Sequence, residues 1–194
     1  MVKLIGSKKI KTAVFISGTG SNLLNLIKFS HTKKSPIKIQ LVISSNKDAK
    51  GINYAKKYRI KNKTFNYEKN NNPEKLILKK LKLNKIDLIC LAGFMKILSS
   101  NFIKRFEGKI LNIHPSLLPK YKGLNTHSRA IKNKERYSGC TVHYVNSKLD
   151  SGKIILQKKV KIGRNDNYFT LKAKILKQEH ILYPKAIIKL FSNP

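Results

Sequence analysis

The chain has 194 residues, enough to bury a sizeable core and to form one α/β domain or at most two small ones. Apolar residues make up 41% of the sequence, which excludes a wholly disordered chain. The 42 basic and nine acidic residues give a formal net charge of +33. The lysines are spread from Lys3 to Lys189, without arginine forks or interleaved aromatic residues. We therefore interpret the charge as a solvated surface with no specific nucleic-acid partner; a basic nucleic-acid-binding module is the alternative.

Other features of the composition limit the setting of the protein. No uncharged apolar stretch is long enough to cross a bilayer, and the apolar run at 13–16 is too short for a signal sequence. Cys90 and Cys140 lack the CxxC spacing of a redox pair and the clustered His and Cys of a zinc site, so we expect buried free thiols. The sequence therefore predicts a cytoplasmic protein with no membrane partner and no metal ion.

Segments typical of strands and helices alternate over residues 12–113. Short runs of apolar and β-branched residues predict strands at 12–17, 37–44, 64–66, 88–92 and 110–113. Helical spacing or a capping sequence predicts helices after a glycine turn at 18–22 and over 49–58, 73–83 and 99–106. The run LICLA at 88–92 is apolar throughout, which is typical of a central parallel strand buried on both faces.

The remainder of the chain follows a different pattern. After a loop at 115–125, strands are predicted at 138–145 and 154–162, and the turn residues between them favour a hairpin-like connection. A helix is predicted from Tyr168 onward, with Pro184 kinking or restarting it. The sequence therefore predicts one α/β domain over 1–194, in three layers, with a mostly parallel sheet and a Rossmann-like N-terminal half.

The glycine turn is the first candidate binding element. Residues 18–22 (GTGSN) close a strand and open a helix, so backbone N–H groups and the positive helix end would face a phosphate. The turn is not a full GxGxxG fingerprint, because Leu23 occupies the third glycine position, and no Walker A Lys-Ser/Thr follows. A plain tight connection that needs glycine for a positive φ is the alternative.

The second candidate element is Asn112 with His114, at the carboxyl end of a predicted strand, where open α/β sheets bind their ligands. Residues two apart in a strand point to the same side, so both side chains can converge on one reacting centre. A histidine can move a proton or stabilise an oxyanion, and the asparagine amide can donate to the same oxygen. Asp150, in the loop after a later strand, can approach His114 and stabilise its cation.

With these residues in place, the chain resembles the phosphoribosylglycinamide formyltransferases. The resemblance covers almost the whole chain in the family's order and rests on the segments FISGTGSNL (15–23), LAGFMKIL (91–98), NIHPSLLPKYKG (112–123), HYVNSKLDSGKIILQ (143–157) and QEHILYP (178–184). It implies the formyltransferase fold and formyl transfer from 10-formyltetrahydrofolate, as co-substrate, to the amine of N1-(5-phosphoribosyl)glycinamide in de novo purine biosynthesis. It implies direct attack without a covalent enzyme intermediate and without a metal.

The resemblance also implies roles for individual residues. In the ribonucleotide subsite, Gly20, Ser21 and Asn22 would hold the phosphate and Glu179 would contact the glycinamide amine. In the catalytic set, Asn112 and His114 would stabilise the oxyanion, while Asp150 would orient His114, raise its pKa and help relay the proton. The formylfolate subsite would comprise Met95, Lys96, Ile97, Leu98, Asn112 and the loop at 146–149.

The chain departs from the family at two places. Where the family has a folate-contacting arginine, the chain offers only Lys69, which we expect to substitute for it. One histidine of the family's H-T-H segment is Asn125 here, and we interpret the following His127 as structural. The remaining histidines receive the same interpretation: His31, His143 and His180.

Two related enzymes remain as alternatives. A methionyl-tRNA formyltransferase shares the fold and donor, and a formyltetrahydrofolate deformylase uses water as the acceptor. Both resemble longer chains with an additional domain, so the length favours the ribonucleotide enzyme. We expect small-molecule substrates and a monomer or weak homodimer.

Overall fold

The computed structural model describes residues 9–67 and 72–191 of the chain. Its strands are Ile10–Ile16 (β1), Ile37–Ser44 (β2), Lys61–Thr64 (β3), Leu88–Leu91 (β4), Lys109–His114 (β5), Tyr137–Tyr144 (β6) and Ile154–Lys161 (β7). Its helices are Ser21–Ser30 (α1), Ile52–Lys57 (α2), Pro73–Leu83 (α3), Ser100–Arg105 (α4), Thr126–Lys132 (α5) and Tyr168–Phe191 (α6).

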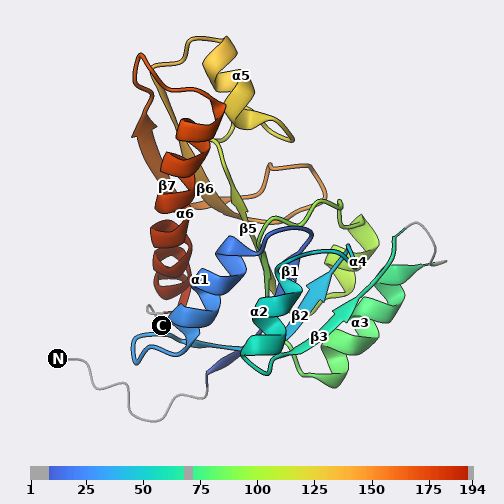
Figure 1. Cartoon of the computed structure of the whole chain (residues 1–194). Coiled ribbons are helices and arrows are strands. Elements are labelled where there is room, and N and C mark those ends of the chain that lie inside the picture. The colour runs from blue at the N-terminus through green and yellow to red at the C-terminus, as the bar shows by residue number, and fades with distance from the viewer. Residues whose placement is uncertain (1–8, 68–71, 192–194) are drawn as a thin grey trace.

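The strands of the described residues form one sheet in the order β3-β2-β1-β4-β5-β6-β7. The neighbours from β3 to β5 pair in parallel, whereas β5 with β6 and β6 with β7 pair antiparallel. Parallel neighbours need crossover connections, which the helices between β1 and β5 provide (Figure 1). The predicted α/β class with a mostly parallel sheet is confirmed.

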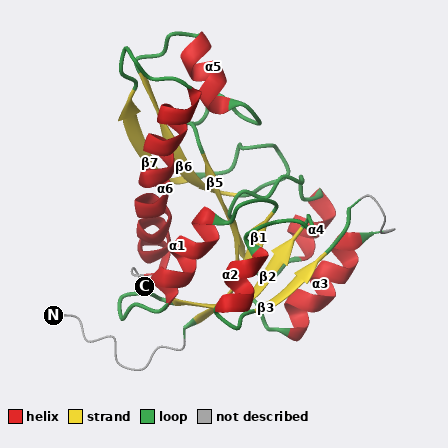
Figure 2. Ribbon diagram, viewed as in Figure 1, coloured by secondary structure: helices red, strands yellow, loops and turns green. Residues whose placement is uncertain are grey.

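Alternate residues of the strands supply two apolar cores on opposite faces of the sheet. In β1, Val14 and Ile16 belong to one core, while Ala13 and Phe15 belong to the other. The first core includes buried residues of α1, α2, α5 and α6, and the second includes residues of α3 and α4. Figure 2 shows helices on both sides of the sheet. The three predicted layers are therefore present, and the central strands are buried on both faces.

Several element boundaries differ from the sequence prediction. The helix α5 at 126–132 was not predicted, because its buried residues Thr126, His127 and Ala130 do not form an apolar stripe. The third strand lies at 61–64, three residues before its predicted start, and none of its residues is fully buried. Such an exposed edge strand leaves little hydrophobic pattern to read.

Pro184 lies inside the continuous helix α6 and does not restart it. A proline has no N–H to donate to the carbonyl four residues earlier, which here belongs to His180. Asn25 of α1 takes the place of that missing donor, because its Nδ2 donates to the His180 carbonyl at 2.7 Å. A side chain from a neighbouring helix thus satisfies the backbone group that the proline leaves free.

The order of the strands places a topological switch point at the carboxyl ends of β1 and β4. The chain leaves β1 toward β2 on one side and reaches β4 on the other, which is the switch point where open α/β sheets bind ligands. The two loops that follow these strands are joined there, because Ser17 N–H donates to the Gly93 carbonyl at 3.0 Å.

Cys90 and Cys140 are free and buried, as predicted. Among the described helices, none has both the length and the apolar composition needed to cross a bilayer.

Candidate active site

The glycine turn forms the entrance to α1. Gly20 is the N-terminal cap of the helix in the left-handed region, with φ of 75°, and no side chain caps the first turn. That turn also lacks an acidic residue. The backbone N–H groups at the start of α1 and the positive end of its dipole are therefore available to an anion.

The glycine at position 20 is required for the turn itself. A β-carbon at Gly20 would lie 2.5 Å from the Cα of Gly51, on the connection between β2 and α2. Gly51 N–H in turn donates to the Gly18 carbonyl at 3.0 Å. The tight-connection interpretation of this turn therefore holds, and it is compatible with phosphate binding because the β-carbon would meet Gly51 and not the helix N–H groups.

Glu179 of α6 lies against the end of the glycine turn. Its Oε2 accepts a hydrogen bond from Asn22 Nδ2 at 2.7 Å, and both side chains are buried. Burial raises the pKa of Glu179 to about 7, although the Asn22 hydrogen bond acts in the opposite direction. Glu179 is also close enough to Cys140 of β6 for its charge to raise the pKa of that thiol, after the larger effect of burial. Glu179 thus lies between the glycine turn and β6.

The three predicted catalytic residues lie together at the end of β5. Asn112 Nδ2 donates to Asp150 Oδ1 at 3.3 Å, and His114 Nδ1 lies 3.4 Å from Asp150 Oδ2. The Gly123 N–H also donates to Asp150 Oδ2, at 2.9 Å. His114 Nε2 lies 2.9 Å from the Tyr121 carbonyl, which can only accept, so Nε2 carries the proton in the neutral ring. The three residues that the sequence singled out therefore lie close together in the structure.

A fourth polar residue, His143 of β6, belongs to this group. Its Nε2 lies 3.3 Å from Asn112 Nδ2 and 3.6 Å from Asp150 Oδ1, and its Nδ1 lies 2.7 Å from the Tyr144 carbonyl. The sequence interpretation of His143 as structural missed these contacts. The signal was absent from the local sequence, because the contact depends on the antiparallel register that places His143 opposite Asn112.

Burial and the interactions within this group shift the pKa values of His114 and Asp150 in opposite directions. Burial holds the pKa of His114 below its usual value, although the Tyr121 carbonyl and the charge of Asp150 act in the opposite direction. Asp150 thus raises the pKa of His114, as expected, but burial has the larger effect and the net shift is downward. Burial alone would raise the pKa of Asp150, but the contact with His143, the hydrogen bond from the Gly123 N–H and the charge of His114 hold it below its usual value. The neutral imidazole thus faces an ionised carboxylate through Nδ1, the atom at which it can take up a proton.

The segment expected to contact formylfolate divides between surface and core. Met95 and Ile97 are 66% and 73% exposed, so two large apolar side chains face solvent. Leu98 is only 5% exposed and packs in the core that includes α3 and α4, so its side chain is not available to a ligand. The Met95 N–H donates to Ser17 Oγ at 2.8 Å, which ties this segment to the end of β1. The expected contact at Lys69 lies outside the described residues.

The other histidines lie outside the cluster at Asp150. His127 is buried edge-on to Tyr168, with ring centroids 5.8 Å apart, and burial followed by the charge of Lys172 lowers its pKa to about 4. The ring of His31 lies 6.1 Å from that of Tyr58, and His180 packs near α1. Within the described residues, no group of three or more His, Cys, Asp and Glu side chains is arranged to hold a metal ion.

Residues 10–187 match the family model described as formyl transferase. The phosphoribosylglycinamide formyltransferase of Haemophilus influenzae is 46% identical over 186 residues, which cover 94% of this chain and 87% of that protein. The human trifunctional purine biosynthetic protein adenosine-3 is 41% identical over 93% of this chain, which corresponds to 18% of that protein.

A solved structure agrees with these sequence matches. The phosphoribosylglycinamide formyltransferase of Brucella melitensis superposes with a TM-score of 0.90 and 41% identity, over 94% of this chain and 96% of that one. The fold, the length of the matches and the level of identity agree. The chain therefore belongs to the formyl transferase family and, within it, to the phosphoribosylglycinamide formyltransferases.

Proposed function

We propose that this chain transfers a formyl group from 10-formyltetrahydrofolate to the amine of N1-(5-phosphoribosyl)glycinamide, a step of de novo purine biosynthesis. The observation that carries the proposal is the group of Asn112, His114 and Asp150 in a chain of this family. The side chains of Asn112 and His114 each lie within 3.4 Å of the Asp150 carboxylate. We propose that residues 1–194 act as one domain, as a monomer or weak homodimer in the cytoplasm.

The substrate phosphate binds at the uncapped start of α1, at Gly20, Ser21 and Asn22. Support comes from the absence of a side-chain cap and of an acidic residue in the first turn. Glu179 contacts the glycinamide amine. The position of Glu179 between Asn22 and Cys140 is consistent with this role. It lies between the start of α1, where the phosphate would bind, and β6, the strand that carries His143.

Formylfolate binds over the exposed side chains of Met95 and Ile97, with Lys96, the backbone of Leu98 and the loop at 146–149. Exposed apolar side chains suit a pteridine ring, and Leu149 of that loop is also exposed. Asn112 faces the same subsite from β5. Lys69 supplies a cation in place of an arginine.

The reaction proceeds by direct attack. The amine nitrogen bonds to the formyl carbon, and the carbonyl electron pair moves to oxygen. Asn112 Nδ2 donates to that oxyanion, and the positive charge that His114 gains on protonation stabilises it through space. The attacking nitrogen loses its proton to the pair of His114 and Asp150, directly or through water. Collapse of the intermediate breaks the bond to N10 of the folate, which takes up a proton and leaves as tetrahydrofolate.

The proposal is tested with purified protein, 10-formyltetrahydrofolate and one of two acceptors, the ribonucleotide or initiator methionyl-tRNA. We expect turnover only with the ribonucleotide, and formylated tRNA as the main product would overturn the assignment. His114→Ala should lose turnover. His31→Ala is the matched control, because His31 is exposed and packs on Tyr58.

A further inference from the structure

The backbone of Tyr121 holds one ring nitrogen of His114. Tyr121 has φ of 56°, the left-handed region that a non-glycine residue adopts at a cost. Its carbonyl lies 2.9 Å from His114 Nε2. The same loop presents the N–H of Gly123 to Asp150 Oδ2 at 2.9 Å. The conformation of this loop therefore decides which atoms face the pair of His114 and Asp150.

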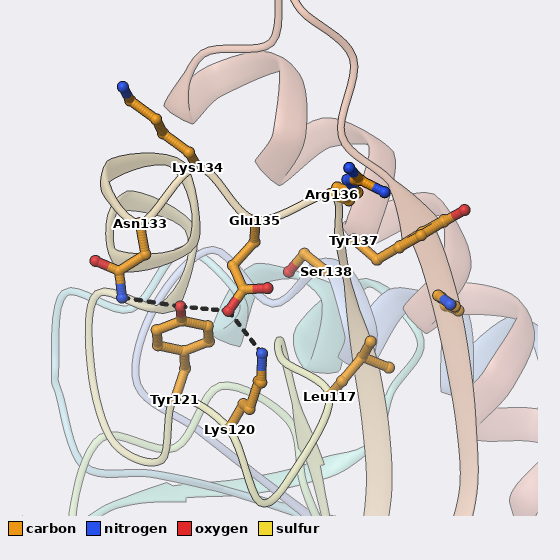
Figure 3. A pocket seen from close by; sticks show the side chains of 10 residues that line it. Leu117, Lys120, Tyr121, Asn133, Lys134, Glu135, Arg136, Tyr137 and Ser138 are labelled. Carbon is orange, nitrogen blue, oxygen red and sulfur yellow. Dashed lines mark hydrogen bonds and ion pairs between the residues drawn. The ribbon is translucent and has the colours of Figure 1, made fainter.

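The side chain of Tyr121 is held by three residues on or just after α5, as Figure 3 shows in part. The Tyr121 hydroxyl donates to Glu135 Oε1 at 2.9 Å and accepts from Asn133 Nδ2 at 3.0 Å. The guanidinium of Arg129 lies over the ring, 5.0 Å from its centroid. We refer to Glu135, Asn133 and Arg129 around this ring as the Tyr121 clamp.

The Tyr121 clamp lies beside an open cavity and is not buried in the core. A cavity of about 640 Å³ is lined by Tyr121, Asn133 and Glu135, and it does not include Asn112, His114 or Asp150. Glu135 Oε1 also accepts from Lys120 Nζ at 2.8 Å. The hydrogen bonds from Lys120 and Tyr121 hold the pKa of Glu135 below its usual value, so it is an ionised acceptor. Its side chain can therefore be changed without opening a hole in either apolar core.

We propose that Glu135 and Asn133 are positioning residues for formyl transfer: they hold the phenol of Tyr121 so that its carbonyl stays on His114 Nε2. This contact fixes the tautomer of His114, with the proton on Nε2 and a free Nδ1 facing Asp150. Without the Tyr121 clamp, residue 121 relaxes from the left-handed region and its carbonyl turns away from the ring. The inference rests on the proposed function, because it takes His114 as the proton acceptor.

The groups that face His114 set the direction of the expected change. Asp150 favours its charged form, whereas His143 of β6 and Arg129 of α5 disfavour it. His127, also on α5, is close enough for its own pKa to be affected by the charge of His114. The Tyr121 carbonyl raises the pKa of His114, so releasing it lowers that pKa further. The limb of the pH–rate profile that titrates with His114 should therefore move to lower pH.

The first experiment compares kcat and KM in variants of Tyr121 itself and of the Tyr121 clamp. Tyr121→Phe and Glu135→Ala should each lower kcat about three- to tenfold, the factor that matches one ordinary hydrogen bond, with both KM values within about twofold. Glu135→Gln should recover kcat, because it has the same charge as Glu135→Ala but keeps an acceptor for the phenol. The double variant Tyr121→Phe/Glu135→Ala should be no slower than Tyr121→Phe alone, because both substitutions remove the same hydrogen bond.

Two further variants and a spectroscopic measurement separate positioning from folding. Asn133→Ala removes a donor at an exposed position, and Arg136→Met changes a cavity residue outside the Tyr121 clamp as the control. Long-range ¹H–¹⁵N correlation spectra report the tautomer of His114. We expect an Nε2–H tautomer in the parent protein and a mixture in Tyr121→Phe and Asn133→Ala.

The outcomes distinguish this inference from the proposed function. Loss of turnover in His114→Ala, together with parental kcat, pH profile and tautomer in the variants of the Tyr121 clamp, would overturn the inference alone. Normal turnover in His114→Ala would overturn the catalytic assignment on which it rests. An equal loss of kcat in Glu135→Gln and Glu135→Ala would show that the charge of Glu135 matters and not its hydrogen bond to the phenol. That result would also overturn the inference.

Discussion

Replacing Glu179 with glutamine should change how the stability of the protein depends on pH. Burial raises the pKa of Glu179 from 4.5 to about 7, so the folded state binds this proton more tightly than the unfolded chain. The stabilisation of the folded state by this proton is fully present below about pH 4.5 and is lost as the pH rises through about 7. The shift corresponds to about 3 kcal/mol, most of it lost between about pH 5 and pH 8.

Glu179→Gln keeps an oxygen that can accept from Asn22 Nδ2 but cannot ionise. Urea unfolding at a series of pH values should therefore show the variant gaining about 2–3 kcal/mol relative to the parent from about pH 5 to pH 8. Other titrating groups are common to both proteins and cancel in the difference. Glu107→Gln, at an exposed position, controls for the loss of one negative charge. A difference that does not vary with pH would refute the claim that burial raises the pKa of Glu179 in the folded state.

Three further substitutions test the catalytic cluster and the glycine turn. Asp150→Asn keeps the shape of the side chain but removes its charge, so kcat should fall about 10²- to 10⁴-fold while both substrates bind within a few-fold; near-normal kcat would make Asp150 a turn residue. His143→Leu removes a polar contact that lowers the pKa of Asp150, so activity should be lost at a higher pH on the acid side, as a pH–rate profile would show. Gly20→Ala would place a β-carbon against Gly51 at positive φ, so we expect about 2–3 kcal/mol of destabilisation and, in calorimetry, weaker ribonucleotide binding with folate binding retained.

Elements with a strong local pattern were predictable from the sequence. The strand at 37–44 and the helix at 73–83 have the predicted bounds, because the first is a β-branched run and the second has a cap with a proline at its start. The helix at 126–132 has neither an apolar stripe nor a side-chain cap, and the sequence did not indicate it. Predictability therefore followed the strength of the local signal.

The candidate site was predictable in its residues but only partly in its contacts. Asn112 and His114 share a strand face, so their convergence follows from spacing alone. The contact of His143 depends on the pairing of two strands, and the bond between Asn22 and Glu179 joins residues 157 positions apart. Leu98 was placed with the ligand by resemblance, although its side chain lies in the core. Such contacts depend on tertiary packing, which no local pattern encodes.

The proline in α6 has a consequence for how two helices are aligned. An uninterrupted helix uses its carbonyl groups internally and offers a neighbouring helix no backbone acceptor within its length. Pro184 releases one carbonyl, at His180, and Asn25 bonds to it one turn beyond the bond from Asn22 to Glu179. These two bonds fix both the axial position and the rotation of α1 relative to α6. Glu179 of α6 and the N-terminal end of α1 are therefore held at a fixed distance from each other by bonds within the protein itself.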